Sequence, residues 1–205
     1  MLKVENKYKF QERLTFIPIT DEMIVLAEEH QRLLREQHGE QNILTDDCDI
    51  TGSLAQQAVA WQMRAWGFEP KDSPIFDKNI RSDKCDFEWR YEKHDFRQPL
   101  DLRCKIDVKG SPLGKGWHTV YPKSRLLVQN NKREKHLQKG IDRYLFVKID
   151  HDDETDKPLQ AIVVGFYNVN NFWKYGLDGS DMKVKEPTTY VLAKDCTPFK
   201  EFIFA

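Results

Sequence analysis

The feature that most constrains the fold is a change in the spacing of apolar residues near Gly67. Before it, apolar side chains recur at helical spacing in a stretch that begins near Thr20 and again over residues 53–66. This spacing predicts two amphipathic helices, the second ended by Gly67. After it, apolar and polar residues alternate over residues 85–91 and 102–109, which predicts two strands, each with one buried and one polar face.

The remaining segments extend this pattern to a complete sheet. We expect the two alternating strands to pair as an antiparallel hairpin. A short basic helix is predicted over residues 132–139, followed by apolar strands over 144–149 and 161–167 with an acidic turn, 150–156, between them. The order of these elements predicts an α/β (α+β mixed) fold, with a central mixed sheet flanked by helices.

The chain shows neither an internal repeat nor a low-complexity linker, so we expect residues 1–205 to form a single domain. Within it we expect three parts. These are an N-terminal helical region (1–50), a core (51–170) and a C-terminal extension (171–205).

Composition indicates a soluble protein of the cytoplasm. Hydrophobic residues make up 40% of the chain, enough for a packed core, yet no apolar run has the length of a membrane span. The four cysteines are isolated and form no Cys-x-x-Cys pair, as expected for reduced thiols. We therefore expect a cytoplasmic location and no membrane partner.

Charge is strongly segregated although the net charge is only -1. The segment from Arg103 to Lys148 contains twelve Lys and Arg residues against three acids. This asymmetry indicates either a surface that faces a polyanion or an ordinary solvated face. On the first interpretation the residues that contact nucleic acid are Lys115, Lys123, Arg125, Gln129, Lys132 and Arg133, with Lys135, His136 and Lys139 as further phosphate contacts.

The loop over residues 110–121 mixes glycines, cations and aromatic side chains. It is typical either of a loop that follows a phosphate backbone or of a plain connection. On the first interpretation His118 contacts phosphate, and Trp117 or Tyr121 stacks on bases. A general-base role for His118 or His136 is an alternative, although a surface histidine is the simpler interpretation.

The most informative group for chemistry is Asp86 together with the run Asp107-Val108-Lys109. Side chains two apart on a strand share a face, so Asp107 and Lys109 project together, and strand pairing would bring Asp86 to the same side. Two carboxylates on a rigid sheet, with the carbonyl of Val108 as a further oxygen, favour Mg²⁺ or Mn²⁺. The alternative is a solvated strand face with a cross-strand ion pair.

A metal held there would polarise a phosphoryl oxygen and supply hydroxide near neutral pH. Lys109 would hold the attacking water or offset the charge that develops on the phosphate. The catalytic residues predicted from this arrangement are Asp86, Asp107 and Lys109.

In these residues, and in the order of its elements from Gly52 to Asn168, the chain resembles the PD-(D/E)XK superfamily of restriction-endonuclease-like nucleases. The resemblance implies a restriction-endonuclease-like fold and a metal-dependent endonuclease that hydrolyses DNA phosphodiesters. It also implies that Asp86 and Asp107 bind the metal, that Lys109 is the catalytic lysine and that Gln129 is a supporting polar residue. A homodimer is a further expectation, because two strands are cut by one site per chain.

The chain departs from the superfamily pattern at several positions. Cys85 stands where proline is usual, and Asp107 where glutamate is commoner. Gln56 replaces a helix glutamate of many members, and an amide is a poorer Mg²⁺ ligand than a carboxylate. Asp49 or Glu88 would be the residues to compensate.

Two other functions fit the same sequence. One is a nuclease-fold module that binds DNA without catalysis, which Gln56 favours. The other is a protein-interaction subunit whose basic segment meets an acidic partner. The first predicts salt-sensitive DNA affinity without metal-dependent turnover, and the second predicts weak DNA binding.

Overall fold

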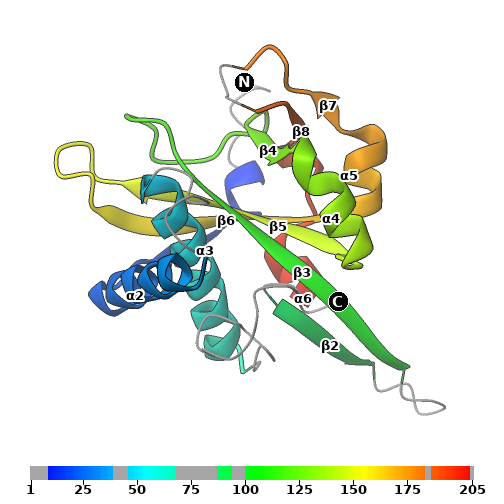
Figure 1. Cartoon of the computed structure of the whole chain (residues 1–205), viewed down its shortest axis with the longest axis horizontal. Helices are drawn as coiled ribbons and strands as arrows, with labels where there is room; N and C mark the ends of the chain where they lie inside the picture. The colour runs from blue at the N-terminus through cyan, green and yellow to red at the C-terminus, as the bar shows by residue number, and fades with distance from the viewer. Residues whose placement is uncertain (1–8, 39–45, 68–86, 94–99, 183–185, 204–205) are drawn as a thin grey trace.

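The computed structural model describes residues 9–38, 46–67, 87–93, 100–182 and 186–203. Within them the chain forms a mixed α/β fold with two sheets and flanking helices (Figure 1). The elements are β1 (Thr15–Pro18), α2 (Asp21–His38), α3 (Asp46–Ala65), β2 (Phe87–Lys93), β3 (Leu100–Pro112), β4 (Arg125–Gln129), the 3-10 helix η2 (Asn130–Lys132), α4 (Arg133–Gln138), β5 (Arg143–His151), β6 (Pro158–Asn168), α5 (Val169–Tyr175), β7 (Leu177–Asp178), β8 (Thr188–Leu192), the 3-10 helix η3 (Ala193–Asp195) and α6 (Phe199–Ile203).

The larger sheet has five strands in the order β1-β6-β5-β3-β2. Strands β3 and β5 run parallel, and the other neighbours run antiparallel. The predicted central mixed sheet flanked by helices is therefore confirmed. A parallel pair needs a crossover, and the crossover from β3 to β5 contains β4, η2 and α4.

The predicted antiparallel hairpin is confirmed over its described length. Phe87 of β2 pairs with Ile106 of β3, and the polar residues Glu88 and Lys105 lie opposite one another. This hairpin extends away from the rest of the molecule (Figure 1). Asp86 comes directly before Phe87 and lies outside the described residues.

Helix α3 covers one face of the sheet and α2 packs beside it (Figure 1). A buried cluster joins Leu54 and Ala58 of α3 to Ile106 and Val108 of β3. The helix approaches β3 closely at Gly110, because a Cβ atom there would lie 2.7 Å from the carbonyl oxygen of Thr51. Asp107 and Lys109 alternate with these residues, so they project from the opposite face.

The opposite face is covered by the second sheet and by α4 and α5 (Figure 1). The second sheet has the order β4-β8-β7, and its strands pair antiparallel. Tyr144 and Phe146 of β5 pack against Phe172 of α5, while Leu126 of β4 and Val191 of β8 complete this core.

The sequence predicted the start of α2 and the end of α3, but not the start of α3. Thr20 caps α2, since its Oγ1 accepts a hydrogen bond of 3.2 Å from the backbone N–H of Met23. Gly67 follows α3 with a φ of +84°, as its capping role predicts. Helix α3 begins at Asp46, earlier than the predicted start at residue 53.

The predicted first and third parts of the domain contain more kinds of secondary structure than their descriptions indicated. The region 1–50 also contributes strand β1, which pairs with β6. The region 171–205 supplies β7 and β8, which complete the second sheet with β4. Among the described residues, no helix combines the length and the apolar character needed to cross a membrane.

Candidate functional site

Asp107 and Lys109 lie side by side on the face of β3 that points away from α3. Lys109 Nζ is 2.5 Å from Asp107 Oδ2, and their side chains are 24% and 16% exposed. The parallel register places Asp107 beside Tyr144 of β5 and Lys109 beside Phe146. The predicted acid and lysine are therefore held together on a rigid central strand.

The oxygen Asp107 Oδ2 is unusual because it is shielded from solvent and has no well-oriented hydrogen-bond donor among the described residues. The close Lys109 ammonium supplies charge but does not meet hydrogen-bond geometry. The ammonium therefore compensates the charge of this oxygen, and a hard cation could take its place as the partner of the carboxylate. This carboxylate is an oxygen ligand of the kind that Mg²⁺ and Mn²⁺ take.

For the other predicted metal ligands and supporting residues, the structure shows less than it does for Asp107. Val108 is buried in β3 beside Leu145, so only its backbone oxygen could serve. Glu88 lies on β2 opposite Lys105, and Asp86 lies outside the described residues. No group of three His, Cys, Asp or Glu side chains in the described part of the chain has the arrangement of a metal site.

Gln56 is not brought to Asp107 and Lys109. It lies on α3, which packs on the side of β3 that carries Ile106 and Val108. The helix that carries the amide therefore lies on the face of β3 opposite to the acid and lysine. Its position gives no support to the idea that this residue replaces a metal-binding glutamate.

A buried polar relay forms one wall of the site. Trp173 Nε1 donates a hydrogen bond of 3.0 Å to the hydroxyl of Tyr144, and that hydroxyl lies 2.7 Å from His136 Nδ1. Because the Tyr144 oxygen already accepts from Trp173, its own proton is available to His136 Nδ1. The neutral imidazole then carries its proton on Nε2, which lies 4.0 Å from Asp107 Oδ2.

His136 corrects a prediction made from its surroundings in the sequence. The simpler interpretation was a surface histidine, and a phosphate contact was the alternative, but only 6% of the residue is exposed. Burial, followed by the charge of Lys109, lowers the pKa of His136 to about 4, so it is neutral at pH 7. Burial also raises the pKa of Tyr144 well above its usual value, with the charge of Asp107 adding to the shift.

Several cations gather around this wall. The charges of Lys109, Lys132 and Lys139 all lower the pKa of His136, which shows that they share its neighbourhood. Lys105 adds a further charge here, since its Nζ donates to the carbonyl oxygen of Lys139 at 3.0 Å. The acid and lysine therefore lie beside a cationic surface.

The remaining predicted nucleic-acid contacts are distributed over several elements. Gln129 ends β4, Lys132 ends η2 and the exposed Arg133 begins α4, so these residues follow one another toward the wall. Lys123 is exposed in the loop before β4. Arg125 is engaged elsewhere, because its Nη1 donates to both carboxylate oxygens of Asp181 at 2.9 and 2.8 Å.

Lys115 and Trp117 lie in a different environment, beyond the end of β3. Both line a cavity of about 640 Å³ between the α2 and α3 helices, the loop after β3 and the turn between β5 and β6. This cavity would repel phosphate, because its charged lining is mainly acidic: Glu28, Asp150, Asp152, Asp153, Glu154 and Asp156. Lys115 is thus poorly placed as a phosphate contact.

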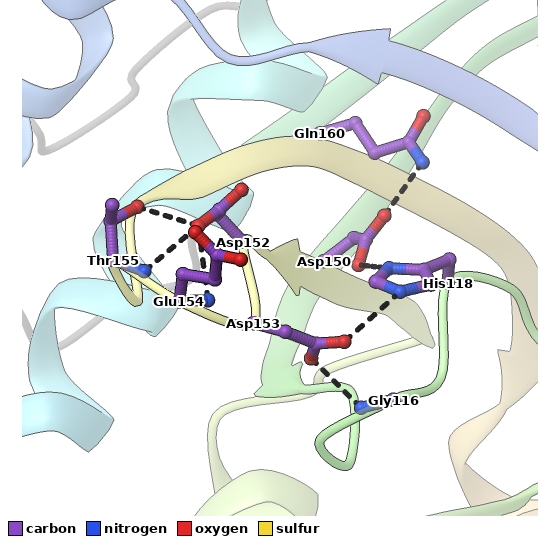
Figure 2. A network of polar contacts seen from close by, with 8 residues as sticks. All are labelled: Gly116, His118, Asp150, Asp152, Asp153, Glu154, Thr155 and Gln160. Atoms are coloured by element: carbon purple, nitrogen blue, oxygen red, sulfur yellow. Dashed lines mark hydrogen bonds and ion pairs between the residues drawn. The ribbon is translucent and has the colours of Figure 1, made fainter.

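His118 fastens the loop that carries these residues to the turn between β5 and β6 (Figure 2). Its Nδ1 lies 3.0 Å from Asp150 Oδ1, and its Nε2 lies 3.3 Å from Asp153 Oδ2. Asp150 is buried and also accepts from Gln160 Nε2 at 2.8 Å, while Asp153 accepts from the N–H of Gly116 at 2.9 Å. The predicted polar turn is confirmed. We call the contacts of His118 with Asp150 and Asp153, which hold the loop against this turn, the His118 clamp.

The clamp predicts a pH dependence of stability. The hydrogen bond with Asp150, followed by its charge, raises the pKa of His118 above 6.5. A raised pKa means that the stabilisation is complete below the unfolded-state pKa and is lost as the pH rises through the folded-state value. We therefore expect His118→Gln to lower the free energy of unfolding more at about pH 5.5 than at about pH 9.

Urea denaturation of both proteins across this pH range measures the difference. His151→Gln is the matched control, since it removes a histidine from the end of β5 that takes part in none of these contacts. An equal loss at both pH values in His118→Gln would mean that the charged imidazole does not hold the loop.

Two groups at the site were missed by sequence reasoning. The Tyr144–Trp173 pair joins β5 to α5, and no local pattern links these elements. The second group is Lys148, whose Nζ donates to Ser111 Oγ at 2.6 Å. Its signal was present, because a lysine interrupts the otherwise apolar run from Tyr144 to Ile149.

Comparisons of the chain with protein-family models, with curated proteins and with solved structures find no match.

Proposed function

We propose that this chain is a metal-dependent endonuclease of PD-(D/E)XK type that hydrolyses DNA phosphodiesters. The observation that carries the proposal is the placement of Asp107 and Lys109 on one face of a central strand, with Asp107 Oδ2 shielded and without a well-oriented donor. A carboxylate suits a metal, and an adjacent ammonium suits a reacting phosphate.

We assign the metal to Asp86, Asp107 and the carbonyl oxygen of Val108. The register of the hairpin supports this set, because Phe87 pairs with Ile106, and Asp86 and Asp107 are the next residues beyond that pair. Mg²⁺ or Mn²⁺ bound there would supply Lewis-acid stabilisation of the phosphoryl oxygens.

Lys109 is assigned to the reacting phosphate. Its ammonium lies on the same face as Asp107 and beside the ring of Tyr144, 5.6 Å from the ring centroid. In a partly buried position such a charge stabilises the negative charge of a phosphoryl transition state more than it would in water.

The DNA partner is proposed from the cationic surface beside the acid and lysine. Lys132, Lys139 and Arg133 could neutralise phosphates that flank the reacting one. The acidic cavity near Lys115 would lie away from the nucleic acid. A homodimer and a cytoplasmic location remain predictions from the sequence.

A second candidate is a nuclease-fold module that binds DNA without turnover. The ion pair itself favours it, because the Lys109 ammonium stands 2.5 Å from the carboxylate oxygen that a metal would use. This candidate predicts DNA affinity that falls steeply with salt and no metal-dependent cleavage.

Nicking of supercoiled plasmid with Mg²⁺ or Mn²⁺, and with a chelator, tests the proposal. We expect cleavage only with metal, and we expect Asp107→Asn to raise the Mg²⁺ concentration that gives half-maximal rate by at least about tenfold. Asp142→Asn is the control, because this exposed acid caps the N–H of Lys105 rather than facing Lys109. Salt-sensitive binding without cleavage at any metal concentration would establish the second candidate.

A further inference from the structure

Lys148 places a partly buried positive charge on the same face of the sheet as Lys109. Among the described residues, no carboxylate oxygen lies within 4.0 Å of its Nζ, and the hydroxyl of Ser111, at 2.6 Å, is its hydrogen-bond partner. Burial lowers the pKa of Lys148 to about 8, so the amine is still mostly protonated at pH 7. A desolvated ammonium with no counter-ion is costly, and an anion beside it would relieve that cost.

Ser111 is oriented by this contact to act as a donor. The ammonium has only protons to give, so Ser111 Oγ accepts, and the hydroxyl proton of Ser111 must point to another acceptor. In the part of the chain that the structure describes, no acceptor for that proton is present. A serine O–H without an acceptor, beside a lysine N–H₃⁺ that has further protons to donate, is a pair of groups that can bind a phosphate oxygen.

The position of the pair relates it to the proposed site. Ser111 lies two residues beyond Lys109 on β3, so both side chains share a face at a separation of roughly 7 Å. The register places Lys148 directly beside Ser111. This spacing is close to the distance between successive phosphates of an extended nucleic-acid strand. Beyond Ile106, the described partner of β3 is β5 alone, which leaves the other edge of the strand without a described neighbour.

We propose that Ser111 and Lys148 form a second phosphate position, which binds the phosphodiester next to the one held at Asp107 and Lys109. This inference rests on the proposed nuclease function. It adds that the substrate must carry a charged phosphate next to the one that reacts. A diester flanked by an uncharged linkage would be a poor substrate, because this second position would then contain an unpaired ammonium.

A single-stranded oligothymidylate with one internal methylphosphonate tests the position directly. Mapping of the cut sites compares cleavage next to the uncharged linkage with cleavage at remote linkages of the same strand. We expect the wild type to cut about tenfold less often at one neighbour of the methylphosphonate. In Lys148→Met and Ser111→Ala we expect this local suppression to disappear, while cleavage becomes slower at all linkages.

Lys157→Met is the matched control, because it removes the same charge from an exposed ion pair with Asp21. It should retain the local suppression. Suppression that persists unchanged in both Lys148→Met and Ser111→Ala would overturn the second phosphate position. Because the alanine variant removes only a hydroxyl group, it keeps the test valid if the methionine variant folds poorly.

Fluorescence anisotropy of the unmodified labelled oligothymidylate in a chelator separates the two proposals. If the wild type cuts no linkage, yet Lys148→Met binds the strand about tenfold more weakly than Lys157→Met does, the nuclease proposal fails and the phosphate position stands. Competition with inorganic phosphate distinguishes a free-anion site. Lys148-dependent binding of inorganic phosphate with unchanged affinity for the strand would overturn the inference.

Discussion

Replacement of Lys109 by methionine is expected to reduce the rate of DNA cleavage by a factor of about a hundred to a thousand at saturating Mg²⁺. The reason is that the ammonium acts where charge develops, on the phosphoryl oxygens of the transition state. The methionine side chain preserves the length and the packing against the ring of Tyr144, so the loss would reflect the missing charge.

The kinetic signature distinguishes this role from that of Asp107. We expect Lys109→Met to lower kcat with little change in the Mg²⁺ concentration required, whereas Asp107→Asn should change that requirement. Lys109→Arg keeps a charge but alters its shape and reach, so it should restore only part of the rate.

Controls for Lys109→Met are available on the same surface. Lys139→Met removes a cation that also lies near His136 but is not on β3. It should weaken DNA binding and reduce the dependence of affinity on salt by about one unit of slope, without a comparable loss of kcat. A kcat in Lys109→Met equal to that of Lys139→Met would refute the catalytic assignment.

Much of this site could be predicted from the sequence because its information is local. The alternation that places Asp107 and Lys109 on one face is a property of a single strand. The antiparallel pairing of that strand with β2 follows from two neighbouring alternating stretches, and the register Phe87–Ile106 agrees with it. Local alternation therefore predicted the face and the hairpin.

The surroundings of the site could not be predicted, because they come from distant parts of the chain. His136 belongs to a run rich in lysine, which is typical of a solvated helix. The hydroxyl of Tyr144 on β5 contacts its ring, and the indole of Trp173 on α5 donates in turn to that hydroxyl. In the same way, His118 contacts Asp150, which lies 32 positions further along the chain. The short strand β4 forms part of a sheet only because it pairs with the distant strand β8.

Gly165 is expected to be the position where a single methyl group is most damaging to stability. It lies in β6 with a φ of +142°, beside the irregularity where β5 and β6 shift register. A Cβ atom there would lie 2.2 Å from the carbonyl oxygen of Thr197. That oxygen accepts the N–H of Phe166 at 2.8 Å, and Phe199, which packs on Phe166, follows closely in the chain.

Gly165→Ala therefore combines backbone strain with a clash that displaces the segment around Thr197 from the sheet. Strain of about 1–3 kcal/mol and a clash of similar size predict a loss of about 2–6 kcal/mol in the free energy of unfolding. Urea denaturation measures it. Gly67→Ala separates the two causes, because Gly67 also has a positive φ, +84°, but no atom of the described residues lies within 4 Å of its Cβ position.

The control should lose only about 1 kcal/mol, which is the cost of the left-handed backbone alone. If Gly165→Ala were no more damaging than Gly67→Ala, the C-terminal segment would not lie against β6 as described. The expected difference between the variants thus measures how firmly this segment closes the sheet that holds Asp107 and Lys109, since β6 is the direct neighbour of β5 and β5 of β3.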